Sequence, residues 1–120
     1  MIARAKLWPE ARADIDALPS AALRVAVTQA LVALQENPWA GAELRDRARV
    51  GDLRGHRRVA FDEPTWDDKP RYRIVYRNEP DDAVVEVVAV IVIGLRERLS
   101  AYRVAATRLR AAHRRRARRR

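Results

Sequence analysis

The chain lacks several residue types on which common functional sites depend. It has no cysteine, which excludes a disulfide framework, thiolate chemistry and a cysteine-based zinc site. Its two histidines, His56 and His113, are isolated in the sequence and cannot build a metal centre alone. The four glycines are scattered, so the chain has no glycine-rich phosphate-binding loop. We therefore expect no metal ion and no small-molecule cofactor.

Long apolar runs are also missing. The longest spans residues 87–93, whereas a membrane-spanning helix needs about 20 apolar residues. Residues 1–14 lack the apolar centre of a secretory signal. We expect a cytoplasmic protein without a membrane partner. With 120 residues, of which 48% are apolar, the chain is long enough for one domain with a modest core.

Basic residues are in excess, and most of this excess lies at the C-terminal end. The chain has 25 lysines and arginines against 16 acidic residues, and six of the arginines occupy the last seven positions. A run of like charges stays solvated and suits a polyanion. Two readings remain open: the run contacts RNA, the ribosome or DNA, or it is a frayed helix end without a role. We predict a single domain over residues 1–112 and an arginine-rich tail over residues 113–120.

Two helices are predicted in the first third of the chain. Pro9 suits the first turn of a helix over residues 9–18, and Pro19 ends it. Ser20 is the expected N-cap of a second helix that continues to about residue 35. Asn37 precedes Pro38 and is pushed out of the α region, which ends this helix. The short break between the helices predicts an antiparallel helical hairpin that covers one face of a sheet.

Three strands and a last helix follow a connector at residues 39–50. Strand patterns occupy residues 53–61, 71–77 and 84–93, and the third is apolar on both faces and therefore central. After Gly94 breaks this strand, we expect a helix over residues 97–112, with Leu99, Val104 and Leu109 partly buried. The order predicts an α+β fold: a helical hairpin packed on a small antiparallel sheet, with a C-terminal helix.

Side-chain alternation divides the predicted sheet into two faces. One face is apolar and suits contact with the hairpin; its residues are Val59, Phe61, Tyr72, Ile74 and Tyr76. The opposite face carries arginines, namely Arg58, Arg71, Arg73 and Arg77. We expect the hairpin to cover the apolar face and the arginine face to stay open.

The last strand and the last helix are expected to add to the open face. Glu86 is the only charge in the last strand, so its even-numbered positions, 88, 90 and 92, should point outward. Arg96 joins them if extended geometry persists beyond Gly94, and Tyr102 could close one end of the face from the helix. Arginine on an exposed strand is ordinary, however, and Tyr102 could equally be a helix residue that packs on the sheet.

Several arginines and a tyrosine on one open face have a defined chemistry. Guanidinium groups are permanently charged and fork onto phosphate oxygens. Metal-free RNA cleavage by the 2′-hydroxyl needs a base, cationic donors for the phosphorane and an acid for the leaving oxygen. A tyrosine can be the base where nearby cations favour its phenolate. Histidine is the commoner base, but His56 lies at the start of a strand beside Gly55 and ranks lower.

Three segments, in this order, resemble the RelE/ParE superfamily of bacterial type II toxins. They are LRG at residues 53–55, YRIVYR at 72–77 and GLRERLSAYR at 94–103. The resemblance spans about residues 9–109 and implies an antiparallel sheet against an N-terminal helical hairpin, with a C-terminal helix. RelE-like members cut mRNA in the ribosomal A site. ParE-like members inhibit DNA gyrase and keep few of the catalytic positions.

The resemblance also implies roles for single residues. It assigns Tyr102 to proton abstraction from the 2′-hydroxyl. It assigns Arg96 to protonating the leaving group or stabilising charge, and Arg73 to binding the phosphate. The family's paired lysines are not reproduced: Arg58 is a candidate for one, and Ala60 falls where the second is expected. The predicted catalytic residues are thus Arg73, Arg96, Tyr102 and Arg58. Further arginines are predicted to bind RNA, namely Arg54, Arg57, Arg71, Arg77 and Arg98.

The sequence therefore favours the toxin of a type II toxin–antitoxin system that acts as a ribosome-dependent mRNA endonuclease. Its expected partners are a cognate antitoxin, the ribosome and mRNA. The antitoxin should wrap the toxin, and the last strand or the terminal helix is a reasonable docking site. The alternatives are a ParE-like inhibitor of DNA gyrase and a non-catalytic basic relative that binds nucleic acid.

Overall fold

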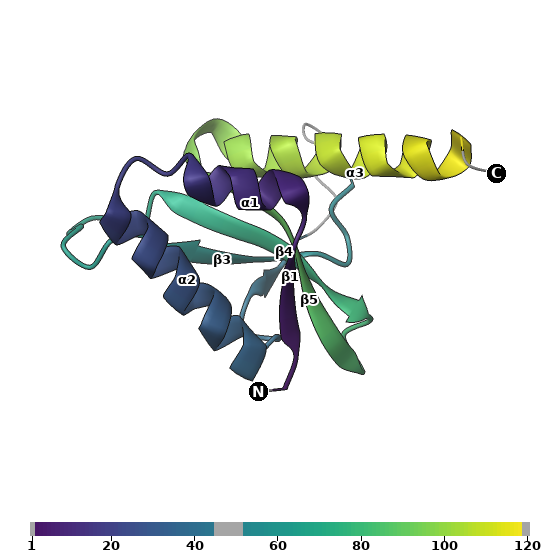
Figure 1. Ribbon diagram of the computed structural model, residues 1–120, viewed down its shortest axis with the longest axis horizontal. Helices are drawn as coiled ribbons and strands as arrows, with labels where there is room; N and C mark the ends of the chain where they lie inside the picture. The colour runs from purple at the N-terminus through teal and green to yellow at the C-terminus, as the bar shows by residue number, and fades with distance from the viewer. Residues whose placement is uncertain (1, 45–51, 119–120) are drawn as a thin grey trace.

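A five-stranded sheet lies between two layers of helices (Figure 1). The computed structural model describes residues 2–44 and 52–118, without the side chain of Arg98. Its elements are β1 (Arg4–Leu7), α1 (Pro9–Asp16), α2 (Ala21–Glu36), β2 (Ala42–Glu43), β3 (Arg57–Phe61), β4 (Tyr72–Pro80), β5 (Val85–Leu95), the 3₁₀ turn η1 (Glu97–Leu99) and α3 (Ser100–Arg118). The predicted α+β class, with its helical hairpin and C-terminal helix, is confirmed.

The helical hairpin forms where the sequence predicts it. Pro9 occupies the first turn of α1. The Ser20 side chain accepts a hydrogen bond of 3.1 Å from the backbone N–H of Leu23 and caps α2, which ends at Asn37. The inner side of α2 packs on the expected apolar face of the sheet. This core includes Leu23, Val27, Leu31 and Leu34 of α2 together with Phe61, Tyr72, Ile74 and Tyr76 of the strands.

The sheet is mixed, because it contains a strand that the sequence did not reveal. The strands follow the order β1-β5-β4-β3-β2, and β3 to β5 pair antiparallel as predicted. The two-residue β2, which lies in the expected connector, also pairs antiparallel with β3. β1 pairs parallel with β5, with Arg4 opposite Val87 and Leu7 opposite Val90. The outer edge of β1 is covered by the end of α2, where the side chain of Gln35 accepts the N–H of Ala5 at 2.9 Å.

A bulge in β5 reverses its alternation. Val75 of β4 is opposite Val92, but Tyr76 is opposite Val90, so Ile91 is the extra residue. Val88 and Val90 therefore face the hairpin and join its core. The prediction that they point away from the hairpin is wrong, because one inserted residue moves the side chains before it, back to Val87, to the other face. A second register shift follows between Glu79 and Pro80.

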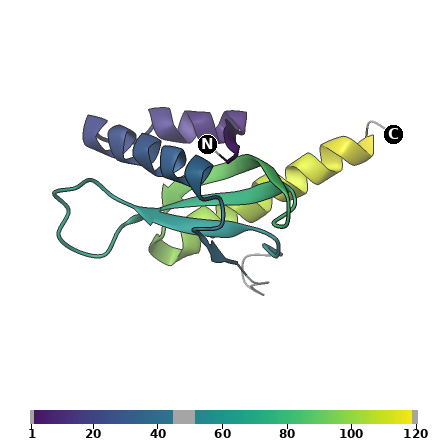
Figure 2. The same cartoon turned by 90° about the horizontal axis from the view of Figure 1, so that it is seen from below.

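The second face of the sheet is covered by α3, so the prediction of an open arginine face is wrong. A second core joins Val75, Ile91 and Val92 of the sheet to Ala101, Tyr102, Ala105 and Ala106 of the helix. Figure 2 shows α1 and α2 on one side of the sheet and the first turns of α3 on the other. Three alanines in the contact stripe let the helix lie close to the strands. Val104, expected to be partly buried, is exposed on the outer side of α3.

An ion pair between Arg108 and Asp14, called the charged clip below, joins α3 to α1 at the edge of β5. Arg108 of α3 donates from Nη1 and Nη2 to the carboxylate of Asp14 in α1, at 2.7 and 3.0 Å. The same carboxylate accepts the N–H of Ile93 at 3.0 Å, and Arg108 also donates to the carbonyl of Ile91 at 2.9 Å. β1 pairs with β5 only as far as Val90. The clip therefore satisfies backbone groups of β5 that β1 does not reach.

Candidate functional site

Arg73, predicted to hold the phosphate, is buried in the middle of the fold. Its side chain shares a face with Arg58, because Arg58 is opposite Val75 and Arg73 is opposite Ala60. The residue is only 7% exposed, and its Nη1 donates to the carbonyls of Pro70 and Tyr72 at 2.8 and 2.9 Å. Arg73 therefore holds the end of the β3–β4 loop through Nη1, while its Nε is buried without a hydrogen-bond partner among the described residues.

Tyr102, predicted to be the general base, lies between α3 and the sheet. It is 3% exposed and belongs to the core that contains Val75, Ile91 and Val92. A general base must come within hydrogen-bond reach of the proton it removes. In this arrangement the first turns of α3 would have to leave the sheet before an RNA hydroxyl could meet the phenol.

Arg96 is the exposed member of the predicted catalytic set. Its backbone has φ −69° and ψ −32°, so extended geometry ends before it and Arg96 does not continue the face of Arg73. Its N–H donates to the carbonyl of Arg71 at 2.8 Å, which places Arg96 beside the start of β4. Arg58 on β3 is half-buried. The four predicted catalytic residues are thus split between the interior and the surface.

Arg96 lines a shallow pocket that contains two other cations. The pocket has a volume of about 300 Å³ and is lined by Lys69, Pro70, Arg71, Leu95, Arg96 and Glu97. Three of these side chains are basic and one is acidic. Lys69 was not singled out from the sequence, although the run from Lys69 to Arg71 carries two cations around one proline. The pocket suits an anion, and phosphate is the obvious one.

Arg71 is already engaged by an acidic partner. Its Nε and Nη2 donate to Asp62 at 2.9 Å each, and its guanidinium stacks on Trp66, 3.6 Å from the ring centre. The Asp62 side chain is 5% exposed. The Arg71 guanidinium lowers the pKa of Asp62 to about 2. The pair closes the β3–β4 loop. The negative charge of Asp62 offsets the positive charge of Arg71 and so weakens its attraction for an incoming phosphate.

Loss of the Asp62 carboxylate should destabilise the protein at neutral pH but not in acid. The pKa of Asp62 is lower in the folded state than its ordinary value, so the ionised pair stabilises the fold above that value and is lost as pH falls towards 2. We expect Asp62→Asn to cost about 2 kcal/mol at pH 7. Urea unfolding at several pH values checks this. A gap between wild type and variant that does not shrink as pH falls from about 4 to about 2 would contradict it.

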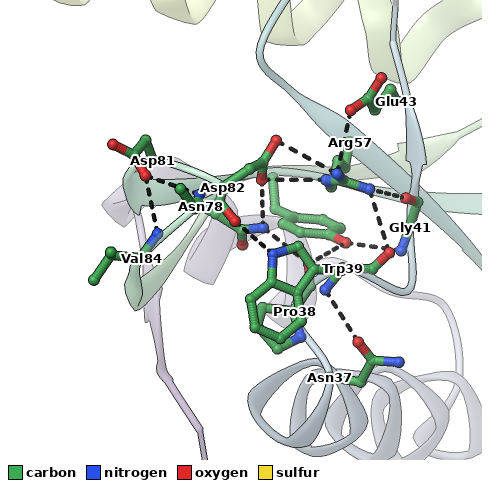
Figure 3. Close-up of polar contacts among 12 residues, drawn as sticks. Asn37, Pro38, Trp39, Gly41, Glu43, Arg57, Asn78, Asp81, Asp82 and Val84 are labelled. Atoms are coloured by element: carbon green, nitrogen blue, oxygen red, sulfur yellow. Dashed lines mark hydrogen bonds and ion pairs between the residues drawn. The ribbon is translucent and has the colours of Figure 1, made fainter.

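Arg57, one of the predicted RNA-binding residues, fastens the connector to the sheet. It donates to the carbonyl of Gly41 at 2.8 Å and pairs with Asp82 and Glu43 at 3.3 Å each. Figure 3 shows these contacts in a network that also includes Trp39, whose indole N–H donates to the carbonyl of Asp82 at 2.7 Å. Arg57 is thus occupied by structural contacts.

Tyr76 is a buried member of the same hydrogen-bond network. It is fully buried; its hydroxyl donates to the carbonyl of Pro38 at 2.9 Å and accepts the N–H of Gly41 at 2.9 Å. Burial raises the pKa of Tyr76, which keeps the phenol neutral. Asn78 also donates to the carbonyl of Pro38, at 3.0 Å. From its place in the strand, Tyr76 was expected only to line the apolar face, and its polar contacts were not predicted.

Gly41 leaves no room for a side chain. A Cβ there would lie 2.5 Å from the Tyr76 hydroxyl oxygen and 2.8 Å from the carbonyl oxygen of Arg58. We expect Gly41→Ala to cost about 2 kcal/mol, measured by urea unfolding. Tyr76→Phe removes the closest atom, so the double variant should cost less than the sum of the two single changes. Strictly additive costs would show that the close approach is unimportant.

The other predicted RNA-binding arginines also have acidic neighbours. Arg77 pairs with Glu79 at 2.9 Å, and Arg54 pairs with Asp52 at 2.8 Å. The Arg54 pair is exposed and therefore weak, so Arg54 can exchange partners. The side chain of Arg98 lies outside the described residues.

His56, the other candidate base, is buried. Its Nδ1 lies 3.1 Å from the carbonyl of Arg54, and its Nε2 is buried without a hydrogen-bond partner among the described residues. Burial lowers the pKa of His56, so the ring is neutral at pH 7. Within residues 2–44 and 52–118, no group of three metal-ligating side chains lies together, and no helix is long and apolar enough to cross a membrane.

The family model for the ParE toxin of the type II toxin–antitoxin system parDE matches residues 6–91. The chain belongs to the ParE toxin family. The resemblance to the RelE/ParE superfamily is thereby confirmed. The matched residues include Arg58 and Arg73 but end before Arg96 and Tyr102. Membership therefore rests on the part of the fold from β1 to the bulge of β5.

Solved structures show the same fold for this ParE family member. A mutant of the Escherichia coli toxin RelE in the free state is similar with a TM-score of 0.59 and 23% identity, covering 91% of this chain and 99% of that one. The toxin–antitoxin complex RelBE2 of Mycobacterium tuberculosis gives a TM-score of 0.53 and 24% identity, covering 80% of this chain and 100% of that one. No curated protein matches the chain.

Proposed function

We propose that this ParE family toxin acts by binding DNA gyrase, as the gyrase-inhibiting members of its superfamily do, and not by cutting mRNA. The burial of Tyr102 carries this proposal. At 3% exposure, inside the core between α3 and the sheet, the phenol is shielded from a 2′-hydroxyl in this arrangement. A toxin that acts by binding needs no general base, so the burial of Tyr102 is compatible with its activity.

The other catalytic positions support the same proposal. Arg73 is committed to the carbonyls of Pro70 and Tyr72. Ala60, which stands where a lysine is expected in a nuclease of the superfamily, is exposed on β3 and offers no cation. Arg96 remains accessible, but a single arginine beside a pocket can bind an anion without any proton transfer.

A supercoiling assay tests the proposal. Relaxed plasmid, purified gyrase and ATP are mixed with increasing amounts of the toxin, and we expect supercoiling to be lost. A topoisomerase that does not need ATP, assayed in the same buffer, controls for adsorption of the basic protein to the plasmid. If gyrase retains full activity under excess toxin, gyrase is not the target.

An mRNA endonuclease is the second candidate, favoured by the cationic pocket of Lys69, Arg71 and Arg96 and by a fold like that of RelE. In this case the first turns of α3 would release Tyr102 when the ribosome is bound. Induction should then create new message ends within open reading frames, and Arg96→Gln should abolish them. Intact messages in arrested cells would remove this candidate.

A cognate antitoxin is the expected protein partner under either candidate. The family is defined by toxin–antitoxin pairs, and RelBE2, one of the similar structures, is a toxin–antitoxin complex. We expect the neighbouring reading frame to encode an antitoxin that binds this chain. Co-expression should restore growth and yield a complex that co-purifies, whereas continued arrest despite co-expression would count against that frame.

A further inference from the structure

The second half of α3 projects beyond the rest of the fold. The buried residues of this helix are Ala101, Tyr102, Ala105 and Ala106, all in its first two turns. From residue 110 to residue 118 no side chain is buried. Figure 1 and Figure 2 both show these last turns, in yellow, running past the edge of the sheet. Only Ala111 and Ala112 of these turns are half-buried, and residues 113–118 are exposed. A helix that continues with so little packing gains little stability from the rest of the fold.

The projecting turns carry positive charge on every side. Residues 100–118 contain no acidic side chain, and the basic residues of the projecting part are Arg110, His113, Arg114, Arg115, Arg116 and Arg118. With 3.6 residues per turn, Arg110, Arg114 and Arg118 form one stripe, and Arg115 and Arg116 point to other sides. Within the described chain, no carboxylate pairs with the arginines from 114 to 118. Like charges four residues apart repel each other, so this helix gains stability when anions surround it.

We propose that residues 110–118 of α3 bind duplex DNA by lying in the major groove and contacting phosphates on both walls. An α-helix with its side chains is about 10–12 Å wide, and the major groove of B-DNA is about 12 Å wide. Cations distributed around the helix match a groove whose two rims are both lined with phosphate. The proposal does not depend on the target of the toxin, because it concerns a part of the chain outside the sheet and its pockets.

The composition of the projecting turns favours duplex DNA over other polyanions. The major groove of A-form RNA is too deep and narrow to admit a helix. Single strands are held by stacking on several aromatic side chains, and residues 110–118 contain no Phe, Tyr or Trp and a single histidine, His113. The same segment has no asparagine or glutamine to read adenine. Binding should therefore depend mainly on charge and groove shape, and any base preference should be for guanine, which arginine contacts in the major groove.

Salt dependence of binding provides the test. The purified chain is titrated against a fluorescent DNA duplex of mixed sequence at several salt concentrations, and the variant Arg114→Gln, Arg115→Gln, Arg116→Gln is compared with it. Glutamine keeps a helix propensity close to that of arginine. The matched control replaces three exposed cations at the other end of the chain, with Arg4→Gln, Lys6→Gln and Arg12→Gln. Thermal unfolding checks that both variants fold.

We expect the α3 variant to bind at least about tenfold more weakly at low salt, with a slope of log affinity against log salt that is smaller by about 3. The control should keep the slope of the wild type. Equal losses in the two variants would overturn the proposal, because total charge would then explain binding. Duplex RNA that binds as tightly as DNA, or polyglutamate that competes as well as DNA, would overturn the assignment to the major groove.

Discussion

Tyr102→Ala should lower the free energy of unfolding by about 3–5 kcal/mol, whereas Tyr102→Phe should cost about 1 kcal/mol or less. The difference follows from the position of the ring. Tyr102 is buried against Val75, Ile91 and Val92, so truncation leaves a cavity between α3 and the sheet. Phenylalanine fills the same space and removes only the hydroxyl.

Urea unfolding of both variants measures these costs, and Val104→Ala is the matched control. Val104 lies in the same turns of α3 but is exposed, so its truncation should change stability by less than about 0.5 kcal/mol. A Tyr102→Ala variant as stable as the wild type would mean that Tyr102 does not hold α3 on the sheet. Its burial would then say little about its role.

Arg108→Met should cost about 3 kcal/mol, the second largest effect we expect. The change removes both hydrogen bonds to Asp14 and the bond to the carbonyl of Ile91. It leaves the Asp14 carboxylate, whose side chain is 20% exposed, without its cation at the edge of β5. Removing one partner of a buried ion pair destabilises a fold more than replacing both partners, because it leaves the other charge buried without a counter-charge.

The double variant Asp14→Asn, Arg108→Met should therefore cost less than the sum of its single changes. Hydrogen exchange gives a second readout, because the amides of α3 should exchange faster when the clip is broken. Arg12→Met, on the same helix as Asp14 but exposed, is the control and should leave both measurements unchanged. Additive costs without faster exchange in α3 would show that the clip does not fasten this helix.

Local signals in the sequence predicted most of the elements. Pro9, Ser20 and Asn37 marked the helical hairpin because capping and proline effects act within a few residues. The alternation in β4 placed Ile74 and Tyr76 towards the hairpin correctly. These features could be predicted because each depends on chemistry close by in the chain.

Features that depend on distant pairing could not be predicted. β1 has only four residues of mixed polarity and becomes a strand by pairing with β5, about eighty positions later in the sequence. The bulge at Ile91 has no local marker, since every residue around it is apolar. Either feature alone changes which side chains share a face.

The burial of the candidate site residues could not be predicted for a related reason. The contact stripe of α3 consists of alanines and Tyr102, which do not resemble a core-facing stripe, so the helix was expected to bury Val104 instead. With α3 on the second face, Arg73 donates to a backbone carbonyl and Tyr102 is buried against the sheet. The same residues identified the family correctly. Their expected catalytic roles need solvent exposure, however, and Arg73 and Tyr102 are buried in the folded chain.

Growth after induction of Tyr102→Phe, compared with the wild-type toxin, tests most directly whether this family member acts by binding. Both proteins should be brought to equal soluble levels, with message ends mapped in the same cultures. We expect Tyr102→Phe to arrest growth as strongly as the wild type, with intact messages in both. A folded Tyr102→Phe variant that lets cells grow while the wild type arrests them would contradict a binding mechanism and restore Tyr102 as the base of a nuclease.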